Sequence, residues 1–154
     1  MNGKRVPPII VLVLILGLSS CAPIRQTTSD QKLARTGLAA TAFPEQKSFL
    51  YIDVPAADSG VSNLMMRAFI GDATFMKQLT SVMARGASES TYVVVGSRSS
   101  GVAYSAVKSA LEGFTGKRLP YLHLGLIGDS SQAEKLRPMV DALGSEYRVL
   151  PSPR

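Results

Sequence analysis

Four apolar runs with helical patterns between them constrain the fold of this 154-residue chain more than any other feature. They are FLYIDV (49–54), TYVVVG (91–96), YLHLGLIG (121–128) and YRVL (147–150). Such nearly continuous apolar runs, rich in β-branched and aromatic residues, are typical of strands that are buried on both faces. Pro55 and Pro151 directly follow the first and the last run, where a proline ends a strand.

Apolar residues at three- and four-residue steps predict helices between these runs. The expected helical regions are residues 62–85, 103–114 and 131–143. Gly71-Asp72 is expected to divide the first region in two, with Asp72 capping its second part.

The last helical region carries start and stop signals of its own. Ser131 and Glu134 have the spacing of a capping box. Pro138 predicts a kink or a late start, and Gly144 predicts the helix end.

The order of elements is thus β-α-β-α-β-α-β. Right-handed crossovers between parallel strands place the connecting helices on the faces of a sheet. We therefore expect an α/β fold, a small three-layer sandwich around a mostly parallel sheet of about four strands. The last strand is the one expected to run antiparallel if any does.

The beginning of the chain has the features of an export signal. Lys4 and Arg5 precede an unbroken run of Ile, Val and Leu over Ile9 to Leu16, and Ser19 and Ser20 follow. The run is shorter than the roughly 20 apolar residues that span a bilayer as a helix. A basic start, a short apolar centre and small residues at its end predict a secretory signal.

The ending Leu18-Ser19-Ser20-Cys21 resembles the lipobox of bacterial lipoproteins. In that family a signal peptidase cleaves before the cysteine, whose thiol carries diacylglycerol and whose amine is usually acylated as well. The resemblance implies that residues 1–20 are a cleaved signal peptide and that Cys21 is the lipidation site. Since Ala22 rather than aspartate follows, it also implies an outer-membrane anchor in the cell envelope, facing the periplasm.

The exported chain is expected to have two parts. Residues 21–47 are polar and are interpreted as the lipidated N-terminus and a flexible tether, with a short helix around residues 31–40. Residues 48–154 are interpreted as a single α/β domain. Loss of Lys4 and Arg5 with the signal lowers the net charge from +6 to +4, and no basic run predicts a nucleic-acid partner.

The stretch AYSAVKSALEGFT (103–115) resembles the catalytic helix of short-chain dehydrogenases, in which a Tyr donates a proton and a Lys lowers its pKa. Tyr104 and Lys108 occupy these places. The chain departs from the family because it lacks the glycine-rich turn after its first strand, and because Ser97 lies only seven residues before Tyr104. We therefore interpret Tyr104, Lys108 and Glu112 as a ladder on an exposed helix face, and expect no cofactor.

Polar residues follow the first three strands, at the edge where open α/β sheets bind ligands. This candidate ligand-binding set consists of Asp53, Ser97, Arg98, Ser99, Ser100, Asp129 and Ser130, with Asp58 nearby. The turn GSRSSG (96–101) precedes a helix, whose first amides could hold an anion beside Arg98. We favour the simpler interpretation that Ser99 or Ser100 caps that helix.

No nucleophile–base pair is visible in the sequence. The single histidine, His123, lies in a strand and is expected to be a hydrogen-bonded structural residue. The spacing of Asp53 and Asp129 does not demand a metal, and none is expected. These features favour a non-enzymatic accessory or assembly component of an envelope complex of the secretion, conjugation or pilus type. The alternative is a periplasmic small-ligand or anion-binding module, or an enzyme, that uses the carboxyl-edge loops.

Overall fold

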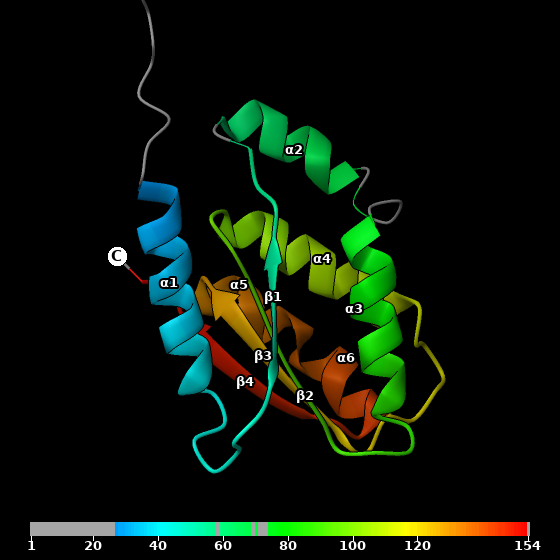
Figure 1. The fold of residues 1–154 in the computed structure, drawn as a ribbon. Coiled ribbons are helices and arrows are strands. Elements are labelled where there is room, and N and C mark those ends of the chain that lie inside the picture. Colours follow the sequence, from blue (N-terminus) through cyan, green and yellow to red (C-terminus); the bar gives the residue numbers. More distant parts are fainter. Residues whose placement is uncertain (1–26, 58, 69, 71–73, 154) are drawn as a thin grey trace, which may run out of the picture.

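A parallel β-sheet forms the centre of the protein (Figure 1). The computed structural model describes residues 27–57, 59–68, 70 and 74–153. The strands are β1 (Leu50–Val54), β2 (Thr91–Ser97), β3 (Leu122–Gly128) and β4 (Glu146–Pro151), in the spatial order β1-β2-β3-β4. All three neighbouring pairs are parallel, which confirms the expected α/β fold. The last strand is parallel as well.

The helices between the strands cover one face of this sheet. Because the strands lie in chain order, right-handed crossovers place every connecting helix on the same side. The helices on this face are α3 (Thr74–Arg85), α4 (Ser100–Glu112), α5 (Ser130–Ala133) and α6 (Arg137–Leu143), with a 3₁₀ turn at Glu134–Leu136. The main core lies here and is built from side chains such as Leu79, Val95, Leu111, Leu124 and Val140. Helix α2 (Gly60–Ala68) lies beyond the carboxyl end of the strands, against α4 (Figure 1).

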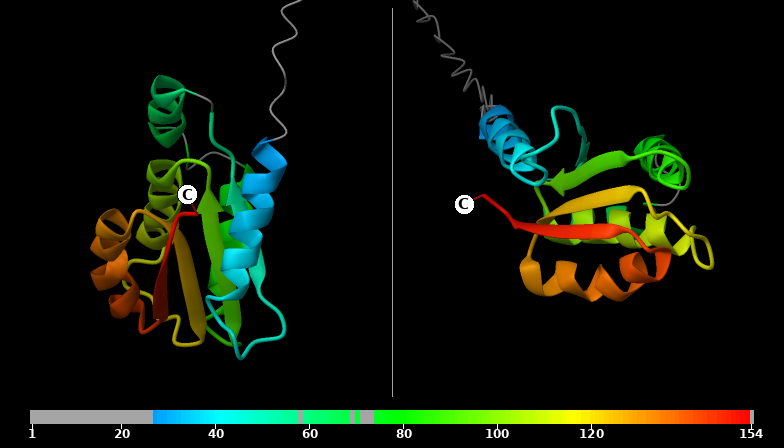
Figure 2. Two further views of the ribbon diagram at one scale, coloured as in Figure 1. Left: turned by 90° about the vertical axis from the view of Figure 1, so that its left-hand side faces the viewer. Right: turned by 90° about the horizontal axis from the view of Figure 1, so that it is seen from below.

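A helix from the N-terminal region covers the opposite face and supplies the third layer (Figure 2). This helix, α1 (Thr27–Ala40), and the turn after it bury Ala39, Ala42 and Phe43 against Val94 and Ile127 of the sheet. The short helix expected over residues 31–40 is thus part of α1. Part of the region interpreted as a flexible tether, residues 21–47, therefore forms a helix and a turn whose buried residues pack on the sheet.

The last helical region differs from the sequence expectation at its start. Asp129, rather than Ser131, is the N-cap residue: its carboxylate accepts a hydrogen bond from the Gln132 amide. The predicted Ser131–Glu134 capping box is therefore wrong. Pro138 lies in the first turn of α6, which agrees with the predicted late start, and Gly144 ends α6 with φ 75° as predicted.

Two expectations concern residues that the structure does not describe. The signal peptide and lipobox, residues 1–21, lie outside the described ranges, and so does Asp72 with its predicted cap. The helices that are described include none with the length and apolar character needed to cross a membrane.

Candidate functional site

The predicted carboxyl-edge residues lie at one end of the sheet, but Asp53 and Ser97 lie on opposite faces of it. Asp53 in β1 is paired in register with Gly96, and Val54 is paired with Ser97. Alternate residues of a strand face opposite sides of the sheet. The Asp53 side chain faces α1, whereas Ser97 follows Val93 and Val95 in phase on the side of the main core. The sheet therefore separates these two polar groups.

The turn between β2 and α4 uses its polar groups for its own structure. Ser99 is the N-cap residue of α4, but its side chain makes no capping hydrogen bond; its amide donates instead to the Ser97 hydroxyl at 3.2 Å. The Ser100 hydroxyl lies 3.3 Å from the hydroxyl of Ser152. The prediction that Ser99 or Ser100 caps α4 is therefore confirmed for the N-cap position of Ser99, but the serine hydroxyl makes no capping hydrogen bond.

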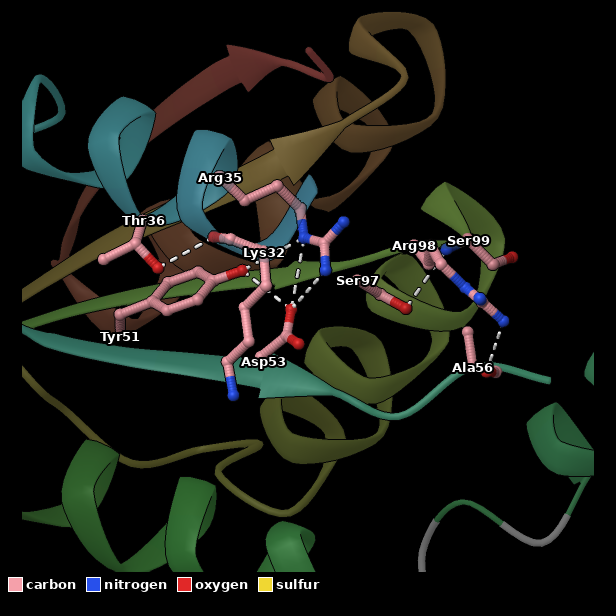
Figure 3. Close-up of polar contacts among 9 residues, drawn as sticks. All are labelled: Lys32, Arg35, Thr36, Tyr51, Asp53, Ala56, Ser97, Arg98 and Ser99. Carbon is pink, nitrogen blue, oxygen red and sulfur yellow. Dashed lines mark hydrogen bonds and ion pairs between the residues drawn. The ribbon is translucent and has the colours of Figure 1, made fainter. Parts of the chain in front are cut away.

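Arg98 reaches from this turn toward the segment that follows β1. Its Nη2 donates to the carbonyl oxygen of Ala56 at 3.2 Å (Figure 3). The guanidinium thus links the segments that follow two neighbouring strands, β1 and β2, which is a structural role.

The third group of predicted residues, Asp129 and Ser130, lies at the start of helix α5, which Asp129 caps. The Asp129 carboxylate accepts hydrogen bonds from the Ser131 hydroxyl and the Gln132 amide, and these bonds lower its pKa. Ser130 is the exposed first residue of α5. In the described part of the chain, no group of three or more His, Cys, Asp or Glu side chains is placed to hold a metal ion.

The structure adds a charged cluster that the sequence did not reveal, between α1 and β1 (Figure 3). Arg35 donates to Asp53 Oδ1 from Nε at 3.2 Å and from Nη2 at 3.0 Å. The Tyr51 hydroxyl donates to the same oxygen at 2.8 Å and lies 3.3 Å from Arg35 Nε. Only 6% of the Arg35 side chain is exposed, so this is a largely buried ion pair.

Burial and charge act together on this cluster. Burial opposes the charge of Arg35, but the hydrogen bonds and charge of Tyr51 and Asp53 outweigh it and raise the guanidinium pKa. Burial, assisted by the hydrogen bond to Asp53, raises the pKa of Tyr51 to about 12. At neutral pH the phenol is therefore a hydrogen-bond donor rather than a base.

A second cluster fastens the end of α1 at the amino end of the strands. The rings of Tyr92 and His123 stack with centroids 4.1 Å apart, and Phe43 meets Tyr92 edge-on. His123 Nδ1 is hydrogen-bonded to Glu146, which also accepts from Arg148. The hydrogen bond predicted for His123 is therefore present.

Arg148 completes the attachment of α1. Its Nη1 donates to the carbonyl oxygen of Ala42 at 2.7 Å, and its guanidinium lies 5.3 Å from the centre of the Phe43 ring. Hydrogen bonds from His123 and Arg148 outweigh partial burial and lower the pKa of Glu146. Both clusters thus join the N-terminal helix to the sheet.

The residues that resemble a dehydrogenase site take part in helix packing. Lys108 Nζ forms an exposed ion pair with Glu112 at 3.5 Å, one turn further along α4. Tyr104 is partly buried and packs against the main core. The predicted ladder therefore exists between Lys108 and Glu112, whereas Tyr104 belongs to the edge of the core.

Comparison with known proteins assigns no family, because the chain matches no protein-family model, no curated protein and no solved structure.

Proposed function

We propose that this protein is a lipid-anchored component of the bacterial cell envelope, with a non-enzymatic accessory or assembly role in an envelope complex. The observation that carries the proposal is the sequence ending Leu18-Ser19-Ser20-Cys21 behind a short apolar run with a basic start. Lipidation at Cys21 with more than one acyl chain would hold the domain stably at a membrane.

The polar chemistry of the domain supports a non-enzymatic role. Arg35, Tyr51 and Asp53 bind one another, and Asp129 binds the first turn of its own helix. A catalytic site instead brings a nucleophile, a base and a binding space together. The described polar clusters attach α1 to the sheet or cap helices, as expected of a rigid module that presents surfaces to partners.

The anchoring part of the proposal is tested by changing the cysteine in the full chain. Cys21→Ser is expected to leave an unprocessed precursor and to abolish acyl labelling, because the acceptor thiol is gone. Ser19→Ala, which keeps a small residue before the cysteine, is the matched control and should be processed and labelled. Normal acyl labelling of the Cys21→Ser chain would contradict the proposal.

The assembly part is tested by mild crosslinking in cells followed by purification of the tagged protein. Discrete envelope partners in fixed stoichiometry are expected. A clean monomer that phosphate or a sugar compound stabilises against unfolding would favour the ligand-binding alternative, because a ligand that binds only the folded state raises its stability.

A further inference from the structure

Helix α1 runs antiparallel to the strands, and this direction fixes where a membrane anchor would attach. Arg35 contacts Asp53, the next-to-last residue of β1, whereas Phe43 packs on Tyr92 at the start of β2. Thr27 lies eight residues before Arg35, which is about 12 Å at the helical rise of 1.5 Å per residue. The first residue of α1 therefore lies at the carboxyl end of the sheet (Figure 1).

The connection from this point to the proposed anchor is short. Only residues 22–26 separate Cys21 from Thr27. At 3.3–3.6 Å per residue, this connection reaches at most about 20 Å. A lipid on Cys21 would therefore hold the carboxyl end of the sheet near the bilayer, with the amino end farther away by the length of a strand.

Two large exposed apolar side chains lie at the same end. Leu33 precedes Arg35 in α1 and is 72% exposed, and Leu64 in α2 is 64% exposed. The third such residue in the described part of the chain, Tyr121, is 50% exposed and directly precedes β3, at the opposite end.

Helix α2 is held firmly at this end, beside the start of α4 (Figure 2). The Asn63 side chain makes two hydrogen bonds with the backbone of Ala57, just after β1. Arg67 donates to the Ser105 hydroxyl of α4 at 2.9 Å. Leu64 thus projects from a helix that hydrogen bonds attach to the rest of the domain.

From these observations we infer that the anchored domain stands on the membrane with the carboxyl end of its sheet toward the lipid, and that Leu33 and Leu64 enter the headgroup region. The inference rests on the proposed lipidation of Cys21. Exposed charges at this end have both signs, with Lys32, Arg67 and Arg98 against Asp30 and Asp129. Because these charges largely offset one another, apolar contact and the anchor, rather than attraction to anionic lipid, are expected to hold the surface.

The orientation can be measured on the full chain after processing in a bacterium that lipidates proteins. Because Cys21 is the only cysteine and its thiol is acylated, an introduced cysteine is the only free thiol. Leu33→Cys, Leu64→Cys and the control Tyr121→Cys each take a thiol-reactive fluorophore. The labelled proteins are placed on phosphatidylethanolamine–phosphatidylglycerol vesicles that contain nitroxide-labelled lipid.

We expect the nitroxide to quench the labels at positions 33 and 64 at least about twofold more than the label at 121, since interfacial apolar side chains lie within about 5–10 Å of the headgroup boundary. This difference should persist at high salt. Equal quenching at the three positions, or stronger quenching at 121, in protein that floats with the vesicles would overturn the orientation alone. Failure of the processed protein to float, with Cys21 open to alkylation, would overturn both the orientation and the proposed anchoring.

Discussion

The hydroxyl oxygen of Tyr51 lies 2.8 Å from the position that a β-carbon would take on Gly96. Tyr51 and Gly96 belong to neighbouring strands. The tyrosine ring lies against Gly96 of β2, where no side chain projects from the strand. Its hydroxyl can therefore reach Asp53, which also receives the Arg35 guanidinium. A glycine in one strand thus makes room for the buried cluster that attaches α1 to another.

We predict that Gly96→Ala lowers the free energy of unfolding by about 1–3 kcal/mol, because an added methyl group in a packed site forces its neighbours to shift. Urea unfolding measures the change. Gly37→Ala is the matched control: a β-carbon on Gly37 in α1 meets nothing within 4 Å, so the exchange should stabilise the helix by about 0.5–1 kcal/mol.

Removal of the tyrosine hydroxyl tests the cause of this loss. In a Gly96→Ala/Tyr51→Phe double variant, the closest clash is gone. The double variant should therefore lose less unfolding free energy than the two single variants lose together. Full additivity would show that Gly96 matters for a reason other than Tyr51.

The alkaline range gives a second prediction, again for Tyr51. Its pKa rises from 10.0 to about 12 on folding. The proton is therefore held more tightly in the folded state, and the resulting stability is fully present below pH 10 and is lost as the pH rises toward about 12. Burial raises the pKa of Tyr147 as well, and this acts in the same direction.

Urea unfolding at a series of alkaline pH values checks this prediction. The decline in unfolding free energy should be shallower in Tyr51→Phe, which no longer has this phenol to ionise. Tyr121→Phe, which removes a hydroxyl from an exposed ring, should keep the slope of the original protein. An unchanged slope in Tyr51→Phe would show that this phenol does not couple ionisation to unfolding.

The sheet could be predicted from sequence because its central strands are buried on both faces. Val93, Val94 and Val95 are all buried, the odd-numbered pair against the main core and Val94 under α1. Consecutive apolar residues therefore mark β2 without any alternation.

Helix α1 could be predicted only in part, because its buried face includes a charge. The buried residues are Arg35 and Ala39 in α1, and Ala42 and Phe43 in the turn after it, and their sequence spacing is helical. An arginine in such a set resembles an exposed position unless its partner is known, and Asp53 lies in another element. The helical spacing of these residues was available in the sequence. The ion pair that allows Arg35 to be buried could not be read from it.

The candidate site shows the same limit. Asp53 and the turn at Ser97 were correctly expected at the carboxyl ends of their strands, since parallel strands end at the same edge of a sheet. Sequence position does not determine which face each side chain takes at the end of a strand, or which backbone groups it binds. The cluster around Asp53 also depends on Arg35 of α1. Because residues 21–47 were interpreted as a tether, this helix was not expected to be part of the fold.

The acidic range gives a third prediction, for Glu146. Hydrogen bonds from His123, and then from Arg148, lower the pKa of its carboxyl below the ordinary value of 4.5. A lowered pKa contributes stability that is present above the unfolded-state pKa and is lost as the pH falls through the lower folded-state value. The free energy of unfolding should therefore decline below about pH 4.5, and this decline should be shallower in Glu146→Gln.

Glu89→Gln is the control for this experiment, since it removes a carboxylate from an exposed pair with Arg85. Chemical unfolding at several acidic pH values should show the slope of the original protein in this variant. If Glu146→Gln also keeps that slope, the contact with His123 and Arg148 does not couple protonation to folding.

The fourth prediction separates helix capping from anion binding at the carboxyl end of the sheet. Asp129 caps α5 through its carboxylate, whereas Ser99 has the N-cap position of α4 without a side-chain bond. Asp129→Ala should therefore cost about 0.5–2 kcal/mol of unfolding free energy. Ser99→Ala should cost less than about 0.5 kcal/mol, as substitutions away from such contacts usually do.

Added phosphate tests whether Arg98, in the turn between β2 and α4, binds an anion. Its guanidinium donates to the Ala56 carbonyl, so its contribution is structural and should not depend on the buffer anion. Thermal unfolding of the original protein and of Arg98→Ala, with and without phosphate at matched ionic strength, should show the same difference in both buffers. A gain in stability from phosphate that occurs in the original protein and is missing in Arg98→Ala would instead identify the turn as an anion site, because only binding to the folded state produces it.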